Sequence, residues 1–164
     1  MGATVTAYVG LGANLDEPIA HVSRAFDELA AFPRTRVTAR SPLYKSAPLG
    51  PQDQPDYINA VAALVTSLAP LELLAALRGI EVLHGRRRDG AHWGPRTLDL
   101  DLLLYGDLVF DTPELALPHP GLHERSFVLY PLADIAPTLV IPGWGRLREL
   151  CAGLKGGRIQ RLEN

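Results

Sequence analysis

Two aspartates alternate with leucines in a stretch that otherwise has the apolar character of a buried strand. Residues two apart on a strand point to the same face and lie roughly 7 Å apart. This spacing predicts that Asp99 and Asp101 lie side by side, with Leu98, Leu100 and Leu102 on the opposite face. Because neighbouring carboxylates repel each other, the fold needs a cation between them.

Two kinds of cation could fill that need. The basic residues just upstream could form a structural ion-pair network with the acids; they are Arg86, Arg87, Arg88 and Arg96. Alternatively, a divalent metal could bind, since Mg²⁺ is commonly held by one or two carboxylates plus phosphate oxygens of a substrate. We favour the metal, because arginines alone would not explain why both acids share one face. The combination indicates an enzyme that handles polyphosphate.

Composition narrows the function classes. The length of 164 residues predicts one domain, spanning residues 1–164. A net charge of −2 and a pI near 6.2 argue against a nucleic-acid binder. The only cysteine, Cys151, excludes a disulfide framework. With no signal-peptide pattern and no apolar run long enough to cross a bilayer, we expect a cytoplasmic protein with no membrane partner.

Apolar periodicity predicts the order β-α-β-β-α-β, which is that of the ferredoxin-like fold. This is an α/β (α+β) arrangement, with a four-stranded antiparallel sheet and both helices on one face. The expected strands cover residues 4–10, 35–44, 57–68 and 97–105, and the expected helices cover 16–33 and 70–85. Later elements are expected as a short strand at 108–110 paired with the fourth strand, a helix at 124–135, an extended piece at 139–141 and a helix at 146–152.

Local signals add further expectations. Gly10 and Gly12 indicate a tight turn from strand to helix. They do not match a dinucleotide fingerprint, whose third glycine would stand where the chain has Leu15. The acidic residues before Pro18 are expected to cap the first helix. The polar tail from Lys155 is expected to fray.

Two long loops, 45–56 and 86–95, are expected to lean over the sheet face that the helices leave open, together with C-terminal elements or a ligand. Trp93 in the second loop is either an anchor or a lid residue. Tyr57 and Asn59 share a strand face, and an aromatic ring beside an amide suits a flat heteroaromatic ligand. The alternative is an ordinary half-buried tyrosine and a turn asparagine.

Four segments together resemble a known family. They are residues 50–60 (GPQDQPDYINA), 96–101 (RTLDLD), 118–119 (PH) and 125–127 (RSF). From Tyr8 to about Pro137 the chain resembles 6-hydroxymethyl-7,8-dihydropterin pyrophosphokinases, also called 2-amino-4-hydroxy-6-hydroxymethyldihydropteridine diphosphokinases. Such enzymes transfer the β,γ-pyrophosphate of ATP to the hydroxymethyl group of the pterin and release AMP, in folate biosynthesis.

The resemblance implies roles for the matching residues. Asp99 and Asp101 would bind two Mg²⁺ ions, and with Arg86 and Arg96 they would form the catalytic set. The implied ATP contacts are Arg86, Arg88, Trp93, Arg96, Leu102, His119 and Arg125. The implied pterin contacts are Ser46, Pro48, Leu49, Tyr57, Asn59 and Phe127, with the rings of Tyr57 and Phe127 on either side of the pterin. Glu81 matches a family position near the phosphate site.

Two positions depart from the family pattern: His92 stands where some members have arginine, and Pro120 where some have tyrosine. Two other functions compete with the kinase. One is a non-catalytic ferredoxin-like binding module whose acids and arginines form salt bridges. The other is a metal-dependent phosphohydrolase. For the kinase we expect a monomer whose partners are the small molecules ATP and reduced pterin.

Overall fold

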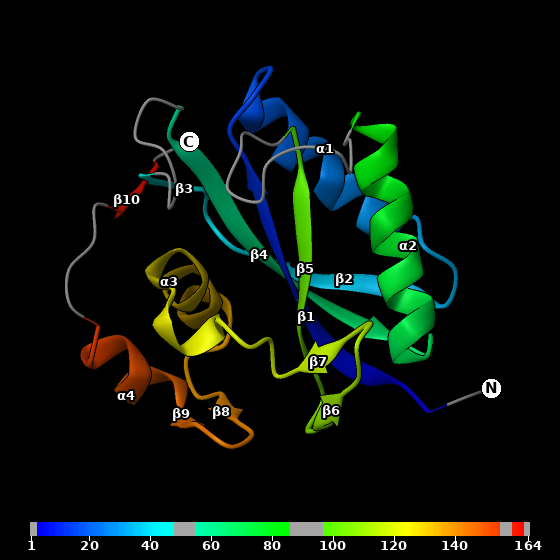
Figure 1. Cartoon of the computed structure of the whole chain (residues 1–164), viewed down its shortest axis with the longest axis vertical. Coiled ribbons are helices and arrows are strands. Elements are labelled where there is room, and N and C mark those ends of the chain that lie inside the picture. Colours follow the sequence, from blue (N-terminus) through cyan, green and yellow to red (C-terminus); the bar gives the residue numbers. More distant parts are fainter. Residues whose placement is uncertain (1–2, 48–54, 86–96, 155–158, 163–164) are drawn as a thin grey trace.

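A six-stranded antiparallel sheet forms the centre of the molecule (Figure 1). The computed structural model describes residues 3–47, 55–85, 97–154 and 159–162. The strands of this sheet are β1 (Val5–Ala13), β2 (Thr35–Arg40), β3 (Tyr44–Ser46), β4 (Tyr57–Thr66), β5 (Asp99–Tyr105) and β10 (Ile159–Arg161). β1 lies between β4 and β5, while β2 and β3 pair with successive parts of β4.

The predicted βαββαβ arrangement is confirmed, with additions. Helices α1 (Pro18–Ala30) and α2 (Pro70–Leu83) cover one face of the sheet (Figure 1). The expected second strand is split in two, because Pro42 has no backbone N–H to donate to a ladder. Part of the tail that is expected to fray is instead paired in the sheet. The described residues 159–162 contain β10, which pairs with β3, and the Leu162 N–H donates to Leu43 O at 2.8 Å.

The helix-covered face holds a continuous apolar core. Alternate residues of each central strand point into it, among them Leu11, Leu64 and Leu100, and all three are buried. They meet Leu29 of α1 and Leu77 of α2. This matches the predicted apolar face of the leucine-rich strand.

The expected acidic cap of α1 is wrong. Glu17 is the N-cap residue, but it makes no side-chain cap hydrogen bond. Asp16 and Glu17 have φ values of 54° and 63°, in the left-handed region. Helix α1 therefore begins with Pro18 in its first turn and without a side-chain cap.

Within the described residues, C-terminal elements cover part of the other face. Helix α3 (Ser126–Ile135) packs on the sheet and α4 (Leu147–Ala152) packs on α3, in one buried cluster with Val61, Leu103 and Leu104, which confirms the expected C-terminal cover (Figure 1). A 3₁₀ turn, η1 (Leu122–Glu124), precedes α3. Strands β8 (Val140–Ile141) and β9 (Gly145–Arg146) pair beside α4.

The strand expected at 108–110 does not pair with the end of β5. Instead β6 (Phe110–Asp111) pairs with β7 (Ala116–Leu117). Thr112 and Leu115 close this hairpin, since the Thr112 N–H donates to Leu115 O at 2.9 Å. The partner of β6 is therefore β7, the segment that follows it in the chain, and not β5. Among the helices in the described ranges, none is long and apolar enough to span a membrane.

Candidate functional site

The functional residues gather on the partly covered face, where three strands bring polar groups into one row. The register places Asn59 of β4 opposite Gly12 of β1, and Gly12 opposite Asp99 of β5. The next row on this face is Val61, Gly10 and Asp101. Since Val61 contacts the α3 side of the sheet, these rows continue the surface that α3 covers.

Gly10 and Gly12 belong to the second half of β1, so the expected turn is wrong. Both residues pair with β4 and β5, which leaves no room for a turn there. A Cβ atom on Gly12 would lie 3.3 Å from Asn59 Oδ1 and 3.9 Å from a ring carbon of Tyr57. Within the described residues, the glycines leave a strip without side chains between the polar end of β4 and the aspartates, which we call the open strip. The sequence interpretation missed this role of the glycines. Their two-residue spacing within a strand pattern was the signal for it.

Asn59 is held in place at one side of this strip. Its Nδ2 donates to Ser46 Oγ at 2.6 Å, and both side chains are buried. Because Asn59 Nδ2 donates to Ser46, the other amide atom, Oδ1, faces Gly12 as an acceptor. Tyr57 pairs with Ser46 in the ladder and, two residues from Asn59, shares its face. The structure thus brings together three predicted pterin contacts: Ser46, Tyr57 and Asn59.

The aspartate pair has the predicted placement. Asp99 and Asp101 share the open face, while Leu100 and Leu102 are buried in the opposite core. Loss of water contact and the Asp99 carboxylate raise the pKa of Asp101 to about 7, although the guanidinium groups of Arg125 and Arg78 favour the charged form. The pair therefore carries a like-charge repulsion that a bound cation would relieve.

His119 and Arg125 lie beside the aspartates. His119 Nδ1 accepts the Gly121 N–H at 3.2 Å, so the neutral ring carries its proton on Nε2, which faces Asp101 Oδ1 at 3.8 Å. Burial and the Arg125 charge lower the pKa of His119 to about 4, so this neutral form prevails at pH 7. A Cβ on Gly121 would lie 2.7 Å from Arg125 Nε, which shows how closely the guanidinium lies against that backbone.

The remaining predicted site residues are either not described by the structure or make no described contact with this group. Arg86, Arg88, Trp93 and Arg96, with Pro48 and Leu49, lie outside the described residues, so their roles stay predictions. Leu102 is 2% exposed in the core beneath the helices, and its side chain does not share the face of the aspartates. Its contact with ATP stays a prediction. Phe127 lies in the first turn of α3, with the Arg125 guanidinium 5.8 Å from its ring centroid. No described contact joins its ring to Tyr57.

The donor set fits Mg²⁺. Within the described ranges, no three His, Cys, Asp or Glu side chains gather to hold a metal unaided. Asp99 and Asp101 offer oxygen ligands only, which suits a hard cation that takes its remaining ligands from water and substrate phosphate. Arg78 of α2, whose charge acts on Asp101, is a further residue that the sequence interpretation missed.

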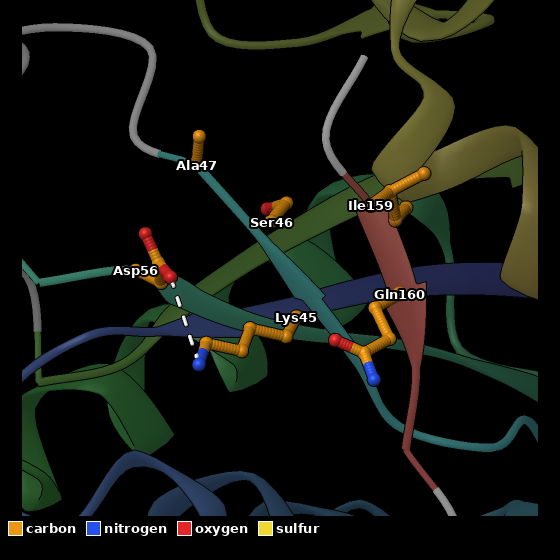
Figure 2. A pocket seen from close by; sticks show the side chains of 6 residues that line it. All are labelled: Lys45, Ser46, Ala47, Asp56, Ile159 and Gln160. Carbon is orange, nitrogen blue, oxygen red and sulfur yellow. Dashed lines mark ion pairs between the residues drawn. The ribbon is translucent and has the colours of Figure 1, made fainter. Parts of the chain in front are cut away.

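A pocket of about 350 Å³ lies at β3 and β10, beside the start of β4 (Figure 2). Its lining residues are Lys45, Ser46, Ala47, Asp56, Ile159 and Gln160. Lys45 Nζ lies 3.8 Å from Asp56 Oδ2, and Figure 2 shows the Lys45 side chain pointing away from the side that Ser46 takes. Of the predicted site residues within the described chain, only Ser46 lines this pocket, so the open strip is the better candidate.

Comparisons with known proteins match most of the chain. The family model described as 7,8-dihydro-6-hydroxymethylpterin-pyrophosphokinase (HPPK) matches residues 8–137. A 2-amino-4-hydroxy-6-hydroxymethyldihydropteridine pyrophosphokinase of Pseudomonas aeruginosa is 54% identical over 155 residues, covering 94% of this chain and 95% of the relative. A protein of the same name from Haemophilus influenzae is 47% identical, covering 89% and 91%. Folic acid synthesis protein fol1 of Schizosaccharomyces pombe is 39% identical over 83% of this chain and 18% of that protein.

Solved structures agree on the fold. Wild-type HPPK-DHPS of Plasmodium falciparum with pteroate has a TM-score of 0.73 and 14% identity, covering 93% of this chain and 42% of that one. The A437G form with STZ-DHP has a TM-score of 0.72, covering 92% and 45%. The chain thus spans less than half the length of these two solved chains.

Proposed function

Since the chain belongs to the 7,8-dihydro-6-hydroxymethylpterin-pyrophosphokinase family, we propose that the open strip across β4, β1 and β5 is its active site. The protein is a pyrophosphokinase of folate biosynthesis. It transfers pyrophosphate from ATP to the hydroxymethyl group of 6-hydroxymethyl-7,8-dihydropterin and releases AMP. The observation that carries the assignment is the cross-strand row Asn59, Gly12 and Asp99, which sets an amide and a carboxylate on either side of a glycine of β1, with Asp101 in the next row.

The pterin end of the strip is at β4. A flat ring can lie over Gly12, where no side chain intervenes, with its edge against Asn59 Oδ1. Tyr57 supplies an aromatic face beside the same glycine. In this pose the hydroxymethyl group would point along the row toward Asp99. Phe127, Pro48 and Leu49 complete the proposed pterin contacts.

The phosphate end is at β5. Asp99 and Asp101 would hold the two Mg²⁺ ions that we propose for this enzyme. When bound, the metal would supply charge neutralisation and alignment of the phosphates and the attacking hydroxyl. His119 Nε2–H and the Arg125 guanidinium are donors that can reach phosphate oxygens, and the proposed contacts of Arg86, Arg88, Trp93, Arg96 and Leu102 would join them.

The chemistry needs little covalent help from the protein. The substrate oxygen forms a bond to the β-phosphorus, the bond from that phosphorus to the oxygen that joins it to the α-phosphorus breaks, and AMP leaves with that oxygen and the electron pair. The hydroxyl proton passes to solvent as the new bond forms. Phosphoryl transfer depends mainly on positioning and charge neutralisation. Arginines at the phosphate end would stabilise the charge that develops on AMP.

We further propose that the enzyme acts as a cytoplasmic monomer on ATP and reduced pterin, without nucleic acid or a membrane. One assay tests the reaction together with the site. Protein, Mg²⁺ and ATP are mixed with or without the reduced pterin alcohol, and the nucleotide product is identified for the native chain and for Asp101→Asn.

AMP formed only with the pterin, and lost in the variant, supports the proposal. ADP formed without an acceptor would indicate a phosphohydrolase. Tight nucleotide binding without Mg²⁺ and without turnover would indicate a binding module. Unchanged AMP formation by the variant would place the metal site elsewhere.

A further inference from the structure

The strand that carries both proposed metal ligands lies at the end of the sheet. No described strand pairs with β5 on the side away from β1. Asp99 lies opposite Gly12 and Asp101 opposite Gly10 in the β1 ladder. Because backbone polar groups of successive residues point to opposite edges, those of Leu100 point away from β1. Buried N–H and C=O groups need partners, so Leu100 must find them outside the sheet.

Two side chains of α2 supply those partners. Glu81 Oε2 accepts the Leu100 N–H at 2.8 Å, and Arg78 Nη1 donates to Leu100 O at 2.9 Å. The N–H belongs to the peptide group between Asp99 and Leu100. The carbonyl belongs to the peptide group between Leu100 and Asp101. Each peptide group that separates the two aspartates is therefore held by one residue of this pair.

The two α2 residues also hold each other. Arg78 Nη1 donates to Glu81 Oε1 at 2.7 Å, and the residues lie one helical turn apart. The Glu81 side chain is 2% exposed, against 35% for Arg78. A buried carboxylate persists only where a charge partner and hydrogen bonds compensate its lost hydration, and Glu81 has both. Charge-assisted hydrogen bonds of this kind are stronger than neutral ones, which suits them to fixing a backbone.

We propose that Arg78 and Glu81 are positioning residues that fix the backbone on either side of Leu100, and so the spacing of the Asp99 and Asp101 carboxylates. The inference rests on the proposed function, because it assumes that those carboxylates hold the metal. The pair acts on the spacing of the aspartates through the backbone groups of Leu100. Removing a partner that orients metal ligands lowers metal affinity by about 10- to 100-fold.

The test measures metal binding and local backbone protection rather than turnover. Mn²⁺ replaces Mg²⁺ in the presence of a non-hydrolysable ATP analogue, and free Mn²⁺ is followed by electron paramagnetic resonance. Exchange of the Leu100 amide hydrogen is followed in the metal-free protein. We expect Glu81→Ala to lower Mn²⁺ affinity by about tenfold. The Leu100 amide should then exchange faster, with the amides of β4 unchanged.

Glu81→Gln separates positioning from charge. The glutamine carbonyl can still accept the Leu100 N–H, so Mn²⁺ affinity should return to within about threefold of native, a small part of the loss that removing an orienting partner causes. Leu73→Ala is the matched control, because Leu73 is fully buried on the same helix and belongs to neither the pair nor the site. It should lower thermal stability at least as much as Glu81→Ala and leave Mn²⁺ affinity unchanged.

Three results would overturn the proposal. Glu81→Ala could destabilise the fold with no change in Mn²⁺ affinity, which would make the pair purely structural. Glu81→Gln could lose as much affinity as Glu81→Ala, which would make the charge decisive. If the native chain itself binds no Mn²⁺ with the nucleotide analogue, the metal site of the proposed function fails, and the positioning role fails with it.

Discussion

The two faces of the sheet use the same strands for opposite purposes. On the α1 and α2 side, β1, β4 and β5 present Leu11, Leu64 and Leu100 to a closed apolar core. On the other side, the same strands present the row Asn59, Gly12 and Asp99, and their apolar residues Val61 and Leu103 are buried in the cluster with α3 further along. Alternation along a strand makes both possible, because neighbouring residues belong to different faces.

The contrast shows where stability and function are separated. The filled face supplies hydrophobic stabilisation, which scales with the apolar area removed from water. The open face carries repulsion between two carboxylates, and the described C-terminal elements cover part of it. Substitutions on the open face should therefore change ligand binding and turnover, whereas those on the filled face should change the free energy of unfolding.

The strongest test of this contrast is Asp99→Ala. We expect the turnover rate to fall by about a thousandfold, since stabilisation by a bound metal is worth several kcal/mol and each 1.36 kcal/mol is tenfold in rate. AMP release in the presence of the pterin measures it. The melting temperature should stay level or rise, because a like charge beside Asp101 is removed. Near-native turnover of this variant would show that the open face does not carry the catalytic function.

Leu64→Ala tests the filled face. Leu64 is fully buried in the core beneath the helices. Its truncation should lower the free energy of unfolding by about 3 kcal/mol, from lost transfer energy and an unfilled cavity. Urea denaturation measures the loss, and the KM for pterin should not move. A clear rise in that KM would mean that the two faces are coupled.

Gly12→Ala tests the proposed geometry of the open strip. The new Cβ would lie 3.3 Å from Asn59 Oδ1, and Asn59 cannot yield easily because Ser46 holds its amide. We expect the KM for pterin to rise by about tenfold, which corresponds to 1.4 kcal/mol. In Gly10→Ala the atoms nearest to the Cβ belong to the Leu103 side chain, at 3.5 Å, an ordinary contact, so its effect should be smaller. An equal rise in the KM for pterin in both variants would argue against a pterin ring that lies over Gly12.

The smallest effect concerns the boundary between α3 and the open strip. Tyr44 donates its phenol hydrogen to Asp134 of α3, and burial together with that carboxylate raises the pKa of Tyr44 to about 12. Because the folded pKa lies above the ordinary 10.0, this contribution to stability is complete below pH 10 and is lost as the pH rises through 12.

Tyr44→Phe should lower the free energy of unfolding near pH 7 by about 1 kcal/mol. It should also remove the part of the alkaline decline between pH 10 and 12 that belongs to Tyr44. Urea denaturation at pH 7 and pH 11 compares the two chains. If the free energy of unfolding falls by the same amount between pH 7 and pH 11 in the native chain and in the variant, the hydrogen bond of Tyr44 does not set this stability.

Strand periodicity was sufficient for the main elements and for the shared face of Asp99 and Asp101, because each of these depends on nearest neighbours in the sequence. The misplaced features depend on partners distant in sequence. Gly10 and Gly12 suggest a turn until β4 and β5 are placed on both sides of them. The pairing of β10 with β3 and the contact of Arg78 with Leu100 likewise require the folded chain.

The outer edge of β5 has a consequence for the behaviour of the protein at high concentration. A leucine-rich strand at the end of a sheet is a template on which another copy can add a strand and begin to aggregate. Arg78 and Glu81 occupy the hydrogen-bonding groups of Leu100 that such an incoming strand would need. The contact that aligns the aspartates thus also protects the folded chain against self-association along this edge.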